Sequence, residues 1–367
     1  MRILFYFGHP AQFHFAKHTI SNLKTHGHKV LLLLKSKDIL EDLVREQGWD
    51  YINIQPKVRK NSKISIATAS MQRTVRVLRE ARSFGADIMI GTDASIAQAA
   101  LILRKPSLTV LEDDVEIIPR LAKVTYPFST AIVVPEECNV GKWSAKKLGY
   151  PGYMKLAYLH PRYFQRQEID ALRVLPSSKP YCLVRLAKLT AHHDDHVAGI
   201  DASQLEKIFA MARAYGLEVY VNSENDMSDS LKTYQLNMAS AVIHQILANA
   251  TLLVSDSQSM TMEAAMLGVP SLRLSNFAGR IRVLEALEKN YELTFGFRND
   301  DFEAMMVKME ELLNMDDLID EFQRRRHLML NNKIDVTAFF TWLIEGYPKS
   351  LQELRQSDNW QEMFRDK

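Results

Sequence analysis

The sequence predicts an α/β protein with two domains, each built around a parallel sheet. Short apolar runs of strand length alternate with amphipathic segments of helix length from one end of the chain to the other. This alternation is interrupted by a proline-bearing stretch between Pro161 and Pro180, after which a second series begins. At 367 residues the chain is long for one core and comfortable as two domains of ordinary size.

The strand candidates fall into two series. The first comprises residues 3–7, 30–34, 51–54, 87–90, 107–111 and 131–134, and the second comprises 181–186, 217–221, 251–254 and 271–274. Helices predicted over 11–26 and 64–84 end at Gly27 and Gly85, because glycine readily adopts the left-handed conformation that stops a helix.

These series define the expected domains. We predict an N-terminal Rossmann-like domain over 1–165, a C-terminal Rossmann-like domain over 178–334 and a helical segment over 335–367. The last segment carries an apolar stripe and is expected to pack across one or both domains; the stripe consists of Phe339, Phe340, Trp342 and Leu343.

Composition narrows the class of protein. Hydrophobic residues make up 47%, charged residues 25%, and the net charge is +2, so neither disorder nor nucleic-acid binding is indicated. Cys138 and Cys182 stand singly, without the spacing of a disulfide framework or a zinc site. No signal peptide is evident and no apolar run approaches the roughly 18 residues of a membrane span. We therefore expect a cytoplasmic protein whose membrane contact, if any, is peripheral.

Ligands of open parallel sheets bind beyond the carboxyl ends of the strands. In the first series these positions hold the turn of Gly8 and His9, which is expected to offer free amides and an imidazole to a nucleotide sugar. They also hold Asp93 and the carboxylate run Glu112 to Asp114. Crowded carboxylates raise one another's pKa, which suits a general acid or base. The alternatives are that His9 and Asp93 cap helices and that the carboxylate run is a solvated turn or a cation site.

The second series offers a phosphate site. The strand over 251–254 leads into a polar turn and a helix whose first amides and dipole suit a diphosphate; the turn consists of Ser255, Asp256, Ser257, Gln258 and Ser259. Glu263, within that helix, could bridge the ribose hydroxyls of a nucleotide. The alternative is simple helix capping, with Glu263 as a surface charge.

Further polar residues follow the neighbouring strands, at Arg185, His192, Ser223 and Glu224. The run from His192 to His196 holds three histidines and two aspartates, but consecutive residues cannot all face one ion, so contact with phosphate or sugar hydroxyls is favoured over a metal site. The motifs of P-loop kinases, zinc hydrolases and serine esterases do not occur.

A basic stripe raises the possibility of an anionic partner. Four arginines recur every three positions in one predicted helix, at Arg73, Arg76, Arg79 and Arg82, and a loop before it carries Lys57, Arg59, Lys60 and Lys63. Such a stripe can bind anionic lipid headgroups or a lipid-linked phosphate. The alternative is a solvated helix face paired with acidic neighbours.

Taken together, these motifs resemble the domain-of-unknown-function family 354, which is related to GT-B glycosyltransferases and UDP-N-acetylglucosamine 2-epimerases. The resemblance covers nearly the whole chain. Its carriers are GHPAQFHF (8–15), GTDASIA (91–97), LEDD (111–114), GYMKLAYLHP (152–161), VRLAKLTAHHDDH (184–196) and SDSQSMTMEAAMLGVP (255–270). The resemblance implies a GT-B-like fold, with two Rossmann-like domains whose parallel sheets face each other across a cleft and C-terminal helices that pack across the domains.

The resemblance also implies site residues. In the similar 2-epimerases, a GDT-like loop and an EAG-like loop supply catalytic carboxylates, which correspond here to Asp93 and Glu112. The epimerase loop that holds UDP corresponds to Asp256, Ser257 and, for the ribose, Glu263. This chain departs from the epimerase pattern where GHPAQ replaces GTRPE and where Gln258 and Ser259 replace two glycines, so a nucleotide-sugar site is implied more strongly than epimerisation.

The sequence thus predicts a metal-independent glycosyltransferase without a cofactor. It would move a sugar from a nucleotide diphosphate sugar, UDP-linked, to a glycan or lipid-linked acceptor hydroxyl in envelope or secreted polysaccharide assembly. The C-terminal domain would hold the nucleotide, and His9, Asp93 or Glu112 would remove the acceptor proton. The alternatives are an epimerase or hydrolase on the same fold, and a non-catalytic nucleotide-sugar binder or scaffold.

Overall fold

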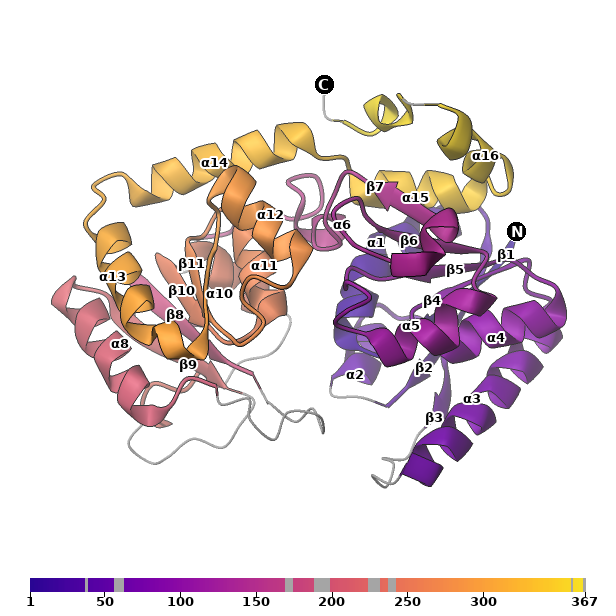
Figure 1. The fold of residues 1–367 in the computed structure, drawn as a ribbon, viewed down its shortest axis with the longest axis horizontal. Coiled ribbons are helices and arrows are strands. Elements are labelled where there is room, and N and C mark those ends of the chain that lie inside the picture. The colour runs from indigo at the N-terminus through magenta and orange to yellow at the C-terminus, as the bar shows by residue number, and fades with distance from the viewer. Residues whose placement is uncertain are drawn as a thin grey trace. The chain divides into compact units, whose positions relative to one another are not determined.

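The computed structural model describes residues 1–36, 39–55, 63–168, 174–187, 199–223, 232–236, 242–357 and 359–365, with the side chains of 63–67 excepted. These residues form two compact units (Figure 1). The first unit combines Met1–Tyr163 with Asn332–Lys367, and the second is Phe164–Asn331. The C-terminal helical segment therefore belongs to the first unit.

In the described part of the first unit, seven strands form one parallel sheet in the order β3-β2-β1-β4-β5-β6-β7. Their bounds are β1 (Arg2–Phe7), β2 (Lys29–Lys35), β3 (Ile52–Gln55), β4 (Ile88–Gly91), β5 (Ser107–Val110), β6 (Ala131–Pro135) and β7 (Lys147–Tyr150). The chain winds outward from β1 to β3 and then returns to the other side of β1, which makes the β1–β4 boundary a switch point of the topology.

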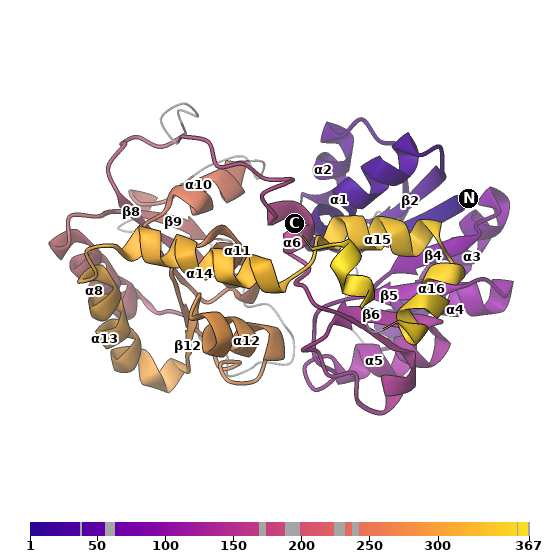
Figure 2. The same ribbon diagram turned by 90° about the horizontal axis from the view of Figure 1, so that it is seen from above.

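Helices cover both faces of this sheet (Figures 1 and 2). They are α1 (Pro10–Thr25), α2 (Leu40–Glu46), α3 (Lys63–Phe84), α4 (Ala94–Leu103), α5 (Pro119–Thr125), α6 (Leu156–Leu159), α15 (Val336–Glu345) and α16 (Lys349–Gln356), with short 3-10 turns at Tyr126–Phe128, Gly141–Lys146 and Trp360–Met363. Helices α1, α6 and α15 pack together on one face, and α4 packs against α3 and α5 on the other.

The described part of the second unit holds a five-stranded parallel sheet in the order β12-β11-β10-β8-β9. Its strands are β8 (Tyr181–Leu186), β9 (Glu218–Ser223), β10 (Leu252–Ser255), β11 (Ser271–Leu274) and β12 (Phe295–Phe297). Its helices are α8 (Ala202–Ala214), α10 (Ile243–Asn249), α11 (Gln258–Leu267), α12 (Arg282–Tyr291), α13 (Phe302–Leu313) and α14 (Leu318–Asn332), with a 3-10 turn at Asn299–Asp301. Here the switch point lies between β8 and β10.

The predicted fold class is confirmed, since both units are parallel sheets covered by helices. Gly27 and Gly85 have φ values of +83° and +69°, as expected of glycines that stop a helix. The sequence pattern missed β7 and β12, which are edge strands of four and three residues. Such short strands carry too little apolar repetition to be recognised from sequence.

The buried carboxylate of Asp335 links the C-terminal segment to the rest of the first unit by hydrogen bonds. Asp335 is 2% exposed, accepts hydrogen bonds from Tyr163 Oη and Arg162 Nη1, at 2.8 Å each to Oδ2, and caps α15 by accepting from Ala338 N. Below it, Phe340 meets Phe15 of α1 edge to face at 4.8 Å between ring centroids. The apolar stripe of this segment therefore fills the core of the first unit.

The arginine stripe of α3 is not uniformly solvated, which corrects the sequence prediction for Arg73. Arg76, Arg79 and Arg82 are exposed, but Arg73 is 8% exposed. Its Nη1 donates to Gln55 Oε1 at 2.9 Å and its Nε lies 3.2 Å from Asp93 Oδ1. The reason is geometric: each step of three residues turns back by about 60° around the helix, so four such arginines span about half the circumference. Lys57, Arg59 and Lys60 lie outside the described residues, as does the side chain of Lys63.

We predict that Arg73→Gln lowers the free energy of unfolding by about 3 kcal/mol, because it leaves the carboxylate of Asp93 without its largely buried counter-charge. Urea denaturation of the purified protein measures this. Arg79→Gln, on the exposed side of the same helix, is the matched control and should stay within about 0.5 kcal/mol of wild type. Equal effects of the two substitutions would contradict the structural role given to Arg73.

Candidate functional site

The polar loops that the sequence singled out lie at the carboxyl ends of adjacent strands. In the first unit, Gly8, Asp93 and Glu112 follow or closely follow β1, β4 and β5, which are neighbours in the sheet. In the second unit, Arg185 and Ser255 lie near the ends of β8 and β10, at the switch point. Each unit therefore gathers, at one edge of its own sheet, those predicted residues that the structure describes.

A row of polar residues crosses the second sheet. Register places Arg185 beside Ser255 on one side and beside Asn222 on the other, and Ser255 beside Arg273. Arg185 donates from Nη1 to Asn222 Oδ1, which fixes its guanidinium near the ends of β8 and β9. Ser223, the next residue of β9, is half-buried at the same edge. Asn222 and Arg273 were not singled out from the sequence.

The turn after β10 is held together by its own hydrogen bonds. Ser257 N donates to Ser255 Oγ at 2.8 Å, and Ser257 Oγ caps α11 by accepting from Met260 N. Asp256 is 8% exposed and its Oδ1 accepts from Ala187 N at 2.7 Å, so this carboxylate ties the loop after β8 to the loop after β10. The amides of Gln258 and Ser259 stand in the first turn of α11, where helix geometry supplies no intrahelical acceptor.

Glu263 is a buried residue of α11 rather than a surface charge. It is 8% exposed, and its Oε1 lies 3.5 Å from Nε2 of His244 in α10. A carboxylate this buried needs a polar partner, and the imidazole supplies one. His244 was missed by the sequence analysis, because no local pattern links it to a residue 19 positions ahead. His192 and Glu224, both predicted to contact the nucleotide sugar, lie outside the described residues.

At the first sheet, the turn after β1 is occupied by structural contacts. Gly8 N donates to Gln12 Oε1 at 2.6 Å, so this amide is not open to a ligand as the sequence suggested. His9 is exposed, and its Nδ1 accepts from Ala11 N at 3.2 Å, which makes it the N-cap of α1. The Lys35 side chain lies beside Gly8. A Cβ atom added at Gly8 would lie 3.2 Å from Lys35 Cε.

Asp93 and Glu112 each make a hydrogen bond and an ion pair. Asp93 caps α4 by accepting from Ser95 N at 2.9 Å, in addition to its ion pair with Arg73. Glu112 pairs with the buried ammonium of Lys155 and accepts from Met154 N at 3.2 Å. The sequence could not reveal the Glu112–Lys155 pair, since the partners are 43 positions apart, although Lys155 lies within a motif that was singled out.

Asp113 and Asp114, in the carboxylate run after β5, have different contacts. Asp114 is 1% exposed and accepts from Asn139 N at 2.7 Å. Asp113 is half-buried and makes no hydrogen bond or ion pair with the part of the chain that the structure describes. Burial, reinforced by the charge of Glu112 and opposed by that of Lys155, raises the pKa of Asp113 to about 6. Burial is thus the first cause of the raised pKa, and crowding of carboxylates the second, at a residue that was not singled out from the sequence.

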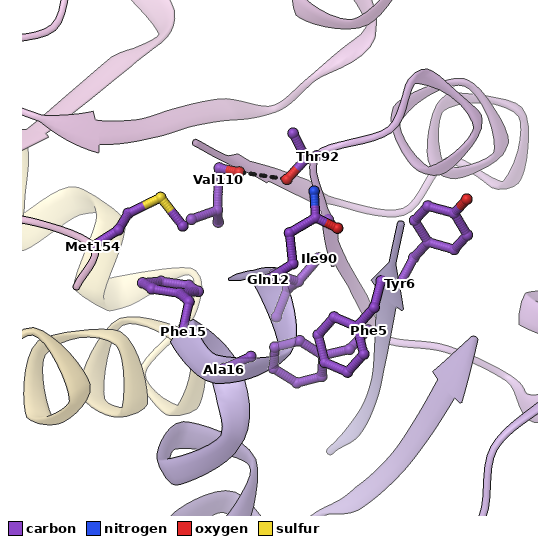
Figure 3. Close-up of a pocket in the computed structure, with 11 residues that line it drawn as sticks. Phe5, Tyr6, Gln12, Phe15, Ala16, Ile90, Thr92, Val110 and Met154 are labelled. Carbon is purple, nitrogen blue, oxygen red and sulfur yellow. Dashed lines mark hydrogen bonds between the residues drawn. The ribbon is translucent and has the colours of Figure 1, made fainter. Parts of the chain in front are cut away.

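A small recess opens at the switch point of the first sheet (Figure 3). Its walls are mostly apolar, with Phe15, Val110 and Met154 prominent. Gln12 and Thr92 are its polar members, and Thr92 Oγ1 donates to Val110 O at 2.7 Å. Met154 N donates to Glu112 Oε2 at 3.2 Å, so one residue of the recess wall contacts the carboxylate run.

The described residues contain no helix long and apolar enough to cross a membrane. Within the same residues, no three histidine, cysteine or acidic side chains gather where they could hold a metal ion. The His192–His196 run lies outside the described part of the chain.

Comparison with solved structures shows a GT-B-like fold. A UDP-GlcNAc 2-epimerase from Neisseria meningitidis, bound to UDP-GlcNAc, has a TM-score of 0.65 at 13% identity, over 96% of this chain and 100% of that one. The enzyme of the same name from Methanocaldococcus jannaschii gives 0.64 at 14%, over 89% and 99%. Spinosyn rhamnosyltransferase, complexed with spinosyn aglycone, gives 0.61 at 13%, over 94% and 99%.

Comparison of the sequence itself finds no family. No protein-family model matches the chain, and no curated protein does. The resemblance to domain-of-unknown-function family 354 is therefore not supported by these comparisons, which show a likeness in fold to solved 2-epimerases and glycosyltransferases.

The environment of Asp113 predicts a pH-dependent effect on stability. Its pKa is about 6 in the folded protein and 3.8 for an ordinary Asp, so ionisation destabilises the fold and stability falls as pH rises from about 4 to 6. Asp113→Asn should remove this loss. The free energy of unfolding of the variant, compared with wild type, should therefore be about 2 to 3 kcal/mol more favourable at pH 8 than at pH 4. Guanidinium denaturation at the two pH values measures it. A difference between variant and wild type that is the same at both would refute the assigned environment.

Proposed function

We propose that this protein is a metal-independent glycosyltransferase that uses a nucleotide diphosphate sugar, most simply a UDP-sugar, to glycosylate a hydroxyl of a glycan or lipid-linked acceptor in envelope or secreted polysaccharide assembly. The observation that carries the proposal is the switch point of the second sheet. There an anchored guanidinium, Arg185, stands beside the turn that opens α11. A cation and a helix N-terminus together suit a diphosphate.

The residues of this edge divide into ligand groups and supports. The half-buried Ser257, Gln258 and Ser259 would offer hydroxyl, amide and backbone donors to the phosphates. Asp256 would hold the two loops in register through Ala187 N instead of meeting the anion, which its charge would repel. Glu263 would meet the ribose hydroxyls, with His244 fixing its orientation.

In the transfer, the acceptor oxygen would bond to the anomeric carbon while the bond from that carbon to the diphosphate oxygen breaks. The leaving diphosphate takes the electron pair and its charge is stabilised by Arg185 and the α11 amides, so no divalent ion is needed for that task. The acceptor proton would pass to a group at the edge of the first sheet, where His9, Asp93 and Glu112 were the candidates from sequence.

An epimerase or hydrolase is the second candidate, favoured by the fold neighbours that carry the name UDP-GlcNAc 2-epimerase. The chain departs from the epimerase pattern at Gln258 and Ser259, where side chains stand in place of glycines. A peripheral membrane contact would rest on Arg76, Arg79 and Arg82, since Arg73 is committed to Asp93.

A panel of UDP-sugars incubated with EDTA, with and without hydroxyl acceptors, tests the proposal by coupled UDP release and NMR of the sugar. We expect UDP release that depends on the acceptor and survives the chelator. Arg185→Gln should lower kcat/KM by about 100-fold, because the leaving diphosphate loses a charged donor. Lys207→Gln, a surface cation of α8 in the same unit, is the control. Conversion of donor alone into an epimer would favour the alternative, and metal-dependent turnover would contradict the metal-independent step.

A further inference from the structure

The outer surface of three adjacent helices in the first unit is both apolar and basic. Helices α3, α4 and α5 lie side by side on one face of the seven-stranded sheet (Figure 1). They expose five large apolar side chains, which together are called the apolar patch: Met71, Val75, Leu101, Ile102 and Val124. These are five of the twelve large apolar side chains that the described part of the chain exposes, so such exposure is concentrated on this face.

Two hydrogen bonds gather the apolar patch around one residue of α4. Gln98 Oε1 accepts from Thr74 Oγ1 of α3 at 3.1 Å, and Gln98 Nε2 donates to the carbonyl oxygen of Val124 in α5 at 3.1 Å. Val75 follows Thr74 directly, and the exposed residues 101–102 lie one turn beyond Gln98. The members of the patch are therefore neighbours on the surface and not scattered side chains.

Exposed cations surround the apolar patch. This basic rim consists of Arg79, Arg82, Arg104, Lys105 and Lys123. At about 100° per residue, the two rim arginines of α3 lie within about 80° of Met71 around the helix. The rim residues at 104 and 105 follow Ile102 closely, and the rim lysine of α5 adjoins Val124. None of the five makes an ion pair with the residues that the structure describes.

Exposed cations elsewhere in the molecule have acidic partners. In the second unit, Lys207 lies 2.6 Å from Glu303 and Lys289 lies 3.0 Å from Glu285, measured from Nζ to the nearer carboxylate oxygen. Helices α3, α4 and α5 together contain one acidic residue, Glu80, which is half-buried. The alternative of a solvated helix face paired with acidic neighbours therefore does not describe this surface.

The chemistry of this face fits an anionic membrane surface. Aliphatic side chains enter the boundary between headgroups and acyl chains, and long basic side chains beside them reach the lipid phosphates. A second copy of the chain would instead bring cations against cations. The cores of protein interfaces are enriched in aromatic side chains, of which the apolar patch has none. Lipid is thus favoured over a protein partner.

We propose that the apolar patch and the basic rim dock this protein on anionic lipid membranes. The patch side chains enter the headgroup layer, and the rim cations lie against the lipid phosphates. Three of the five apolar anchors come from α4 and α5, so the docking surface extends well beyond the arginines of α3. This docking goes beyond the proposed glycosyl transfer and does not depend on it.

Vesicle sedimentation of the full chain measures the docking. We expect wild type to sediment at low salt with phosphatidylcholine vesicles that contain about one third phosphatidylglycerol, and far less at about 0.5 M salt, which screens exposed charges. Arg79→Gln combined with Arg82→Gln should lower the partition coefficient about 25-fold, roughly fivefold for each cation removed. Lys207→Gln combined with Lys289→Gln is the charge-matched control and should sediment like wild type.

The apolar patch has its own arm. Leu101→Ser combined with Ile102→Ser should lower the partition coefficient about tenfold or more, whereas Val307→Ser, at an exposed apolar position of α13, should leave it unchanged. An environment-sensitive fluorophore on Ile102→Cys should shift to the blue when anionic vesicles are added. The native thiols at Cys138 and Cys182 are buried, so the label is confined to the introduced cysteine. Unchanged urea midpoints show that the variants are folded.

Three results would overturn the proposal. Wild type that stays in the supernatant with anionic vesicles has no such docking surface. Sedimentation that survives both the arginine and the Leu101–Ile102 substitutions places the membrane contact elsewhere on the molecule. Retention on immobilised polyglutamate without any binding to vesicles assigns the face to an acidic protein partner instead of lipid.

Discussion

Parallel pairing of neighbouring strands is the constraint on which the rest of this molecule depends. Because every strand in each sheet runs the same way, every loop that follows a strand emerges at the same edge. The pairing of β10 with β8 sets Ser255 beside Arg185, and the pairing of β1 with β4 sets the Gly8 turn beside that of Asp93. Residues 70 to 85 positions apart in the sequence thus become neighbours.

The parallel pairing of the strands could be predicted from the sequence, but the partners of individual side chains could not. Strands with a clear apolar run, such as β1 and β8, were placed within a residue or two, because their burial leaves a local pattern. Pairs such as Arg73 with Asp93 or His244 with Glu263 leave none, since they depend on which helix packs against which strand end. Sequence therefore identifies the loops that matter and leaves open the role of each residue in them.

Most of the polar residues at the two edges are supports. Asp93, Asp114 and Asp256 each accept a backbone amide, and these hydrogen bonds fix the three carboxylates at the edges of the two sheets. In the second unit, Arg185 donates to Asn222 and stands beside the turn that opens α11. Burial raises the pKa of Asp113, so its ionised form is kept at a cost to stability.

We propose above all that a nucleotide diphosphate binds at the edge of the second sheet, at the start of α11. Hydrogen exchange of backbone amides with and without saturating UDP tests it most directly. We predict slower exchange at Ser257, Gln258 and Ser259 and in β8 around Arg185, with no change in α16 of the first unit. Protection confined to the Gly8 to Gln12 turn, with none at the start of α11, would contradict it.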